Sequence, residues 1–554
     1  MSKRRGSDDP TSRPSKRQRQ NATPQGDYLS TLSDEILLEI LSFLPINSLV
    51  VCQRLSKRFH GLAGDSELWK QKYYARWVLP RSLRALQLKH SKSTSGNVYV
   101  PRISKWPGHD HLATADNRPH WKTQYRLRHN WSKGTCTFGV LEVSRPPLPQ
   151  ILMKLYSGVV VTADKEHGLR AWSTRASKKQ LTALSFLSAD DKPTALFMAR
   201  GSSKSSIEVT VGFEDGHFDL YDLNVTLAKF VLRFSQVPST TGSSITSIAS
   251  SHPYILTISQ HRVFSLYKLQ HQTIRQKQNT IVTPSLLASL ESNNMFSPMS
   301  LSLRCLASEV IASIAYSFFH ISSGWTVGIQ ELRFNQDGER IGSRLASTVA
   351  FQPEENNRTG PIDALTFDTR DTGNALIASP HSHSIQYPEA PTSLSYSHPY
   401  LLTSHNDNTL TMYLVASSSE KLSIRAGRRL WGHTSSVSSV QVGDRGKAVS
   451  ISPRGNEIRI WELETAVSPR FNPCPSMKGE SSVRISSEKP TAEAAVSVET
   501  TSGAIHWGRD TVQTEPEAML STRAEGCVTF DEEQVVVLRE RGCRAQLLEC
   551  YDFT

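Results

Sequence analysis

The pattern of hydrophobic and polar positions divides this chain into a helical part and a strand-rich part. Between residues 29 and 77 apolar side chains recur every three or four positions, the spacing of amphipathic helices. From about residue 135 to the end the period becomes two, and short Val/Ile/Leu/Thr-rich runs alternate with Gly, Asn, Asp and Pro. The pattern predicts a small all-α domain followed by a larger all-β domain.

Three short helices are expected in the first part. Ser33 is placed to cap the first helix, which Pro45 ends. The second begins near residue 47 or 48 and reaches Gly64, and the third begins at Asp65 or the next residue. The first helix has one broad apolar face, formed by Ile36, Leu37, Ile40, Leu41 and Leu44. A unit this small buries too little surface to be stable alone, so the pattern predicts a partner protein.

This helical segment carries several short motifs in a fixed order. An acidic helix start follows a leucine, the first helix ends in Leu44-Pro45, the second contains Ser56-Lys57-Arg58-Phe59, and Leu68-Trp69-Lys70 follows. With these motifs the segment resembles an F-box along its whole length. The family usually has proline where this chain has Ser33. The resemblance implies binding to a Skp-family adaptor and, through it, to the cullin and RING subunits of a ubiquitin ligase. The adaptor-facing residues that it implies are Leu32, Ile36, Leu37, Ile40, Leu44, Pro45 and Leu49.

The strand-rich part contains internal repeats. Several predicted strands end in an aromatic residue, and neighbouring members lie 49, 46 and 48 residues apart; these residues are Trp172, Tyr221, Tyr267, Tyr413 and Trp461. Residues 251–257 recur nearly unchanged as residues 397–403. Periods of this length are typical of the blades of a β-propeller.

One repeat, residues 430–463, resembles a full WD repeat, with Gly432-His433 at its start and Trp461 at its end. In that family a His, a Ser or Thr, a turn Asp and the Trp form a hydrogen-bonded set inside one blade. Asp215 and Asp407 each stand six residues before an aromatic, as the turn Asp does, whereas Gly455 stands there before Trp461. The resemblance therefore implies a degenerate WD-type propeller in which Asp215, Asp407, His433 and Trp461 are structural.

About seven blades are expected, and residues 135–143 are the strand that would close the ring by joining the last blade. The weakest blade is the fourth, residues 361–379 offer a further strand or an eighth unit, and 466–500 reads as a loop. The expected domains are a disordered basic tail over 1–26, the F-box over 27–80, a linker and helical connector over 81–134 and the propeller over 135–554. The connector resembles the one that joins the two modules in F-box/WD-repeat proteins and ends in Asn130, Trp131 and Gly134.

The net charge of +12 first suggests binding to nucleic acid, but much of this positive charge lies in the tail. Two tail clusters have the spacing of a bipartite nuclear import signal, the alternative being a solvated basic arm; their residues are Lys3, Arg4, Arg5, Lys16, Arg17 and Arg19. Elsewhere the basic residues are dispersed, and the densest group, Arg425, Arg428 and Arg429, suits either a strand edge or a contact to an acidic motif. We expect the nucleus or cytoplasm, and nucleic-acid binding is the less favoured reading.

No motif for catalysis, cofactor or metal binding is present in the sequence. Lys447 closes a P-loop-like run but Ala448 follows it, and the seven cysteines form no C-x-x-C pair. His109 and His111 lack further ligands nearby. No signal peptide or apolar run long enough to span a membrane is expected. The sequence thus predicts a non-enzymatic substrate receptor of a cullin-RING ligase with an unidentified protein target. A non-degradative F-box scaffold is the alternative.

Overall fold

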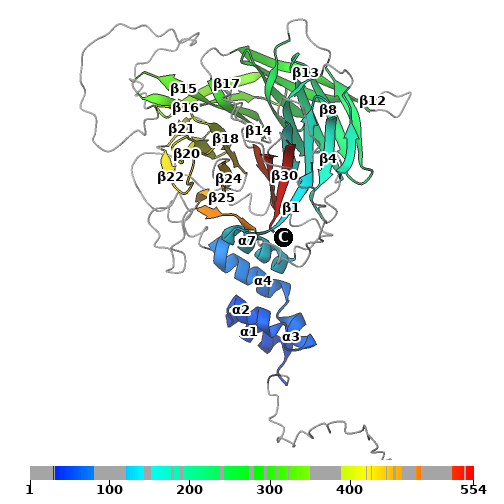
Figure 1. The fold of residues 1–554 in the computed structure, drawn as a ribbon, viewed down its shortest axis with the longest axis vertical. Coiled ribbons are helices and arrows are strands. Elements are labelled where there is room, and N and C mark those ends of the chain that lie inside the picture. Colours follow the sequence, from blue (N-terminus) through cyan, green and yellow to red (C-terminus); the bar gives the residue numbers. More distant parts are fainter. Residues whose placement is uncertain are drawn as a thin grey trace, which may run out of the picture. The chain divides into compact units, whose positions relative to one another are not determined.

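The computed structural model describes residues 29, 31–79, 120–142, 151–349, 388–464, 482–487, 527–541 and 545–554. Short breaks interrupt these ranges at 176–179, 187–190, 202, 204, 237–241, 274–279, 292–295, 307, 322, 419–420, 426, 444–445 and 453–456. The chain forms two compact units, one helical and one built of strands (Figure 1). Within the described ranges, no helix is long and apolar enough to cross a membrane.

Over the described residues 31–79, the helical unit contains four short α-helices and one π-helical turn. They are α1 (Asp34–Phe43), α2 (Ile46–Cys52), α3 (Lys57–Leu62), α4 (Ser66–Tyr73) and η1 (Tyr74–Val78). Leu41, Leu49, Ala63 and Leu68 form its small aliphatic core. Asp65, one of the two residues expected to open the third helix, caps α4, because its carboxylate accepts hydrogen bonds from the backbone N–H groups of Glu67 and Leu68 at 2.9 and 3.2 Å.

The prediction of one continuous second helix was wrong. The chain leaves the helix after Cys52 and begins α3 at Lys57. Ser56 makes the break, because its backbone is extended and its hydroxyl accepts a hydrogen bond from the Phe59 N–H at 3.2 Å. Ser33 occupies the predicted N-cap position of α1, but its side chain makes no capping hydrogen bond.

Aromatic side chains extend the core of the helical unit. Helix α7 (Trp121–Lys133) supplies two of them, and its first residues belong to this unit. The ring of Tyr125 lies edge-on to Trp69 at a centroid distance of 5.4 Å and tilted against Trp77 at 4.7 Å. The Tyr125 hydroxyl also accepts a hydrogen bond from Arg76 at 2.6 Å. Residues 121–125 therefore complete a core that the segment up to Val78 leaves open.

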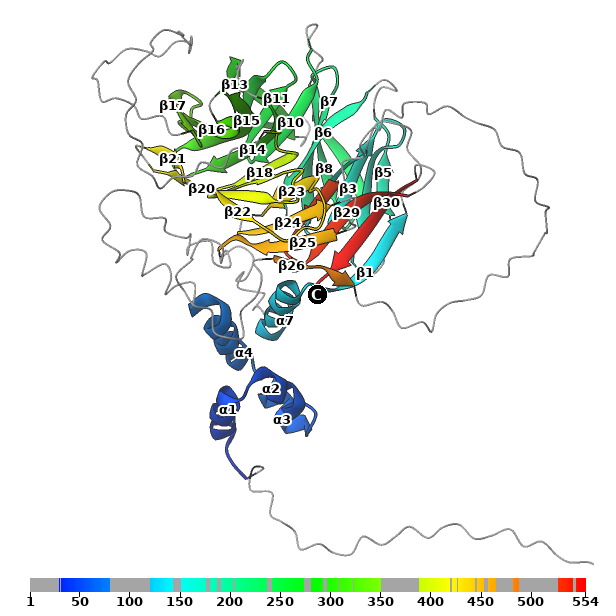
Figure 2. The ribbon, with the colours of Figure 1, turned by 60° about the vertical axis from the view of Figure 1, so that its left-hand side comes forward.

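The strand unit is a propeller of seven antiparallel sheets, which confirms the predicted fold and blade number (Figures 1 and 2). Blades one and two comprise β2 (Leu152–Tyr156), β3 (Val159–Asp164), β4 (Gly168–Ser173) and β5 (Gln180–Leu184), then β6 (Pro193–Arg200), β7 (Ser206–Phe213), β8 (Phe218–Asn224) and β9 (Lys229–Ser235). Blades three and four comprise β10 (Ile245–Ser251), β11 (Tyr254–Ser259), β12 (Val263–Thr273) and β13 (Thr280–Glu291), then β14 (Phe296–Cys305), β15 (Val310–His320), β16 (Gly324–Phe334) and β17 (Arg340–Ser347).

Blade five comprises β18 (Ser393–Ser397), β19 (Tyr400–Ser404), β20 (Leu410–Ser417), β21 (Leu422–Ile424) and β22 (Arg428–Leu430). Blade six comprises β23 (Ser439–Val442), β24 (Lys447–Ser452), β25 (Glu457–Glu462) and β26 (Ser482–Arg484). Blade seven comprises β28 (Cys527–Phe530), β29 (Gln534–Arg541) and β30 (Ala545–Asp552), joined by β1 (Thr135–Glu142) and β27 (Ser486–Ser487). The near-identical segments 251–257 and 397–403 form equivalent hairpins in blades three and five.

The last blade takes its outer strand from the start of the propeller, as predicted. Strand β1 pairs antiparallel with β30, from Thr137 opposite Asp552 to Glu142 opposite Leu547, and Figure 2 shows the two strands side by side. The end of α7 supports this closure. Trp131 stacks on Phe553 at 4.1 Å and donates its indole N–H to the Glu532 carbonyl at 2.9 Å. The ring is therefore closed by segments from both ends of the propeller.

Gly134 follows α7 directly and shows why the connector ends in glycine. Its φ is +69°, and a Cβ atom there would lie 2.4 Å from the Arg484 carbonyl oxygen. The prediction that residues 466–500 form only a loop was wrong in part. Residues 482–484 form β26, the outer strand of blade six, and residues 486–487 pair with the start of β1. Residues 482–487 of the predicted loop therefore contribute to two sheets.

Hydroxyl side chains connect the inner strands of neighbouring blades. The Ser300 hydroxyl accepts the N–H of Tyr396 at 3.1 Å, and the Ser395 hydroxyl accepts that of Val442 at 3.0 Å. Thr529 accepts the N–H of Leu155 at 3.2 Å in the same way. Inner strands of adjacent sheets do not share a backbone ladder, so these hydroxyls satisfy N–H groups that would otherwise be unpaired.

Candidate functional site

Helix α1 carries two apolar stripes, and only one is covered by the helical unit. Leu37 and Leu41 are four residues apart and almost completely buried. Ile36, Ile40 and Phe43 follow a second line at the spacing of neighbouring helical turns, with exposed fractions of 50%, 42% and 78%. A side chain of this size gains about 1.5–3 kcal/mol when it is fully buried. The second stripe is therefore suited to contact with another protein.

Exposed apolar side chains continue beyond Pro45. Val50 and Val51 lie on α2 and Leu55 follows it, with 39%, 58% and 65% of their surface exposed. We call the six residues together the apolar face: Ile36, Ile40, Phe43, Val50, Val51 and Leu55. Single exposed apolar residues are ordinary, but six within twenty residues of a very small unit make this part of the chain a candidate for contact with another protein.

The structure divides the seven residues predicted to contact the adaptor. Ile36, Ile40 and Pro45 are exposed, and Leu32 and Leu44 are partly buried. Leu37 and Leu49, at 1% and 0% exposure, belong to the interior of the helical unit, so they support the face from beneath and do not form part of it. Sequence reasoning missed Phe43, Val50, Val51 and Leu55. The spacing of Phe43 from Ile36 and Ile40 was the available signal.

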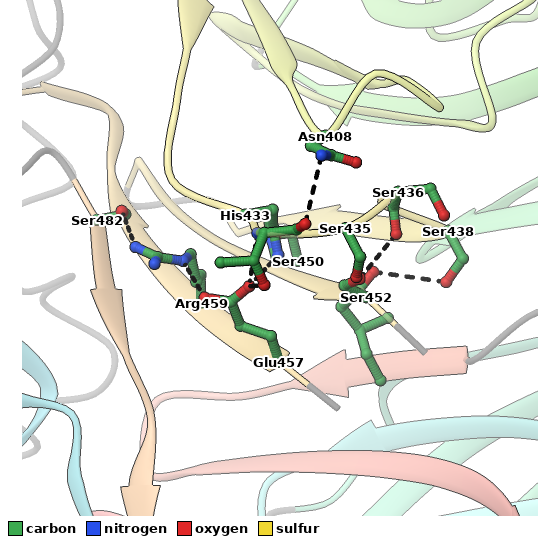
Figure 3. A network of polar contacts seen from close by, with 12 residues as sticks. Asn408, His433, Ser435, Ser436, Ser438, Ser450, Ser452, Glu457, Arg459 and Ser482 are labelled. Atoms are coloured by element: carbon green, nitrogen blue, oxygen red, sulfur yellow. Dashed lines mark hydrogen bonds and ion pairs between the residues drawn. The ribbon is translucent and has the colours of Figure 1, made fainter. Parts of the chain in front are cut away.

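Blade six contains a buried polar network around His433 (Figure 3). The Ser450 hydroxyl lies 2.6 Å from His433 Nε2 and accepts the indole N–H of Trp461 at 2.7 Å. Glu457 lies on the other side of the imidazole, 3.4 Å from Nδ1, and its carboxylate accepts the Thr434 N–H at 3.0 Å. The nearby carboxylate favours the proton on Nδ1, so Nε2 accepts from Ser450.

Glu457 is thus the acid of this network, which the sequence analysis did not find. Arg459 Nε donates to the same carboxylate at 2.7 Å. Burial alone would raise the pKa of Glu457, but the hydrogen bonds from Thr434 and Arg459 and the charge of Arg459 outweigh it, so the pKa of Glu457 is held below its usual range. Burial lowers the pKa of His433 to about 4. These hydrogen bonds connect β24 and β25 of blade six with the segment that precedes β23 (Figure 3).

The two predicted turn aspartates order their own turns. Asp215 Oδ1 accepts the N–H of His217 at 3.3 Å, and Asp407 Oδ1 accepts the N–H and hydroxyl of Thr409 at 3.2 and 2.6 Å. Both turns join the second and third strands of their blades. This is a structural arrangement, since each carboxylate is engaged with the residue two positions further on.

Of the basic group in blade five, Arg428 and Arg429 lie on β22, a strand at the edge of its sheet. Arg429 lies 3.8 Å from Asp407 and over the ring of Trp431 at 5.7 Å. Among the described residues no cluster of His, Cys, Asp and Glu is placed to hold a metal ion. The tail residues 1–26, the histidines 109 and 111, and residues 361–379 lie outside the described residues. Nuclear import and the domain boundaries stay predictions.

Comparison with known proteins agrees with both units. A family model described as the F-box protein pof12 β-propeller matches residues 136–554, and an F-box-like model matches residues 30–75. The chain belongs to the pof12 F-box β-propeller family. The F-box protein pof12 of Schizosaccharomyces pombe is 22% identical over 469 residues, which are 80% of this chain and 88% of that protein. The F-box protein dre-1 of Caenorhabditis elegans is 25% identical over 167 residues, 30% of this chain but only 13% of that protein.

Membership in the pof12 family confirms the predicted combination of an F-box with a C-terminal propeller. The F-box match begins before α1 and ends just beyond α4, so it contains the whole apolar face. The propeller match contains all seven blades. The apolar face therefore lies within the F-box-like domain.

Proposed function

We propose that this protein is the substrate-recognition subunit of a cullin-RING ubiquitin ligase of the SCF type. The F-box would bind a Skp-family adaptor, and the propeller would bind a target protein. The observation that carries the proposal is the apolar face, because six exposed apolar side chains within twenty residues lie on a unit with a very small core of its own. F-box domains generally bind adaptors of the Skp type.

The role proposed for the chain is to bring two proteins together. A target held by the propeller is presented at high effective concentration to the conjugating enzyme that the cullin and RING subunits recruit. This division of labour requires no catalytic group on the chain itself. Proteins that combine an F-box with a propeller are generally adaptors, and we infer the same here.

Changing Ile36 and Ile40 together to Asp in the full-length chain tests the proposal. Both side chains lie on the exposed stripe of α1 and do not support its core. Two carboxylates buried without partners in an interface cost several kcal/mol, so adaptor affinity should fall at least about 100-fold. Affinity is measured by titration with the purified adaptor. A matched variant in which the exposed propeller residues Leu227 and Leu286 become Asp should bind like the parent.

The same variant separates the receptor from a scaffold. Targets are first identified as proteins that co-purify with the parent chain when the proteasome is inhibited. The variant should still capture them but should lengthen their half-lives in a pulse-chase experiment, because capture continues without ubiquitin transfer. Unchanged adaptor affinity would contradict the F-box assignment. Lost affinity with unchanged half-lives of every captured protein would contradict the receptor role.

A further inference from the structure

The start of α1 is held by a residue from another helix. Ser33 stands at the N-cap position, but its side chain makes no capping bond. Arg58, on α3, donates from Nη2 to the carbonyl oxygen of Leu32 at 2.6 Å. The same guanidinium donates from Nε and Nη2 to Asp34 Oδ1 at 2.9 and 2.6 Å. One side chain thus binds the residues immediately before and after the N-cap.

Helix α3 is itself firmly attached to the end of α2. The side-chain amide of Gln53 donates to the Ala63 carbonyl at 2.8 Å, and the Gln53 carbonyl lies 3.1 Å from His60 Nδ1. The Ser56 hydroxyl accepts the Phe59 N–H at the start of α3. Arg58 therefore projects from a helix whose two ends are fixed by hydrogen bonds.

These contacts connect the two halves of the apolar face. One half, on α1, consists of Ile36, Ile40 and Phe43. The other half, on α2 and the turn after it, consists of Val50, Val51 and Leu55. Between them the chain turns through Leu44 and Pro45, and Arg58 forms a second, non-covalent link. An interface made by two helices binds best when their relative position is fixed before binding.

We propose that Arg58 is a positioning residue for adaptor binding, a role that rests on the proposed function. It holds the first turn of α1 against α3, so that both halves of the apolar face meet the adaptor in one rigid arrangement. The ion pair itself is weakly stabilising, because the Arg58 and Asp34 side chains are 38% and 59% exposed. The effect of Arg58 should therefore appear in adaptor affinity and not in the melting temperature of the chain.

The experiment measures adaptor affinity of the full chain by titration, with thermal melting recorded alongside. Arg58→Ala should weaken binding about 10-fold while melting stays within a degree or two of the parent. Arg58→Lys should bind with intermediate affinity, because an ammonium is a point donor and cannot reproduce the forked contact with the Leu32 carbonyl oxygen and Asp34 Oδ1. Arg54→Ala is the matched control, since it removes an exposed arginine of the same segment.

A double-mutant cycle with Asp34→Ala distinguishes positioning from direct contact. If Arg58 acts through the start of α1, the Asp34→Ala, Arg58→Ala double variant should bind no more weakly than Arg58→Ala alone. Additive losses of adaptor affinity would show that Arg58 touches the adaptor itself. A loss of affinity in Arg54→Ala equal to that in Arg58→Ala would show a general charge effect. Either result overturns the proposal. Full affinity of Arg58→Ala would also overturn it and leave the proposed function intact. Failure of the parent chain to bind the adaptor would reject both.

Discussion

At the scale of single residues, blade six shows how a degenerate repeat keeps its internal network. Gly455 stands at the position where the WD pattern has an aspartate, yet a carboxylate reaches the histidine from Glu457. The sequence pattern identified His433 and Trp461 through the resemblance of residues 430–463 to a WD repeat. It missed Glu457 and Ser450 because their roles depend on which side chains the folded blade brings together, and spacing along the chain does not report that.

The buried histidine makes a prediction about acid sensitivity. The pKa of His433 is lowered to about 4 by burial, so the unfolded chain takes up a proton near pH 6.5 while the folded chain does not. Stability is therefore lost as the pH falls from 6.5 towards 4. At pH 5 the loss of folding stability due to His433 amounts to about 2 kcal/mol. Burial lowers the pKa of His405 in the same direction, so His405 adds to this loss.

Denaturant unfolding of the full chain at pH 7 and pH 5 checks this prediction. His433→Asn should be less stable than the parent at pH 7, because the contact with Ser450 is lost, but should lose less stability on going to pH 5. His261→Gln, which changes an exposed histidine of blade three, should retain the sensitivity of the parent. An acid sensitivity in His433→Asn equal to that of the parent would show that the imidazole does not titrate as described.

At the scale of elements, the helical unit depends on a segment far along the chain. The sequence placed its helices between residues 33 and 77, but the aromatic core is completed by Trp121 and Tyr125. Helical periodicity also could not divide the apolar residues of α1 into covered and exposed stripes. It shows that a face is apolar, whereas the packing of α2 to α4 decides which part of that face is left uncovered.

Tyr125 provides the corresponding prediction. Its ring is 3% exposed between Trp69 and Trp77, so Tyr125→Ala leaves a cavity and should destabilise the helical unit by about 3 kcal/mol. Tyr125→Phe keeps the ring and loses only the hydrogen bond from Arg76, at a cost of about 1 kcal/mol. Native-state hydrogen exchange of α4 measures both changes. Similar exchange rates in the two variants would contradict a packing role for the ring.

At the scale of the whole molecule, the closure of the propeller follows from its strand pattern. Residues 135–143 were expected to join the last blade because a closed propeller commonly takes a strand from its start, which removes an exposed sheet edge. They do so as β1, beside β30. The contribution of residues 482–487 to two sheets was missed, since strands of two or three residues are too short to show a period.

The central claim is that the apolar face of the helical unit is the surface that meets the Skp-family adaptor. Hydrogen–deuterium exchange of the full chain, followed by mass spectrometry with and without the adaptor, tests it most directly. We predict slower exchange in peptides covering α1, α2 and α3, between Asp34 and Leu62, and unchanged exchange in all seven blades. Protection confined to the propeller, or no protection of α1 at a saturating adaptor concentration, would contradict the claim.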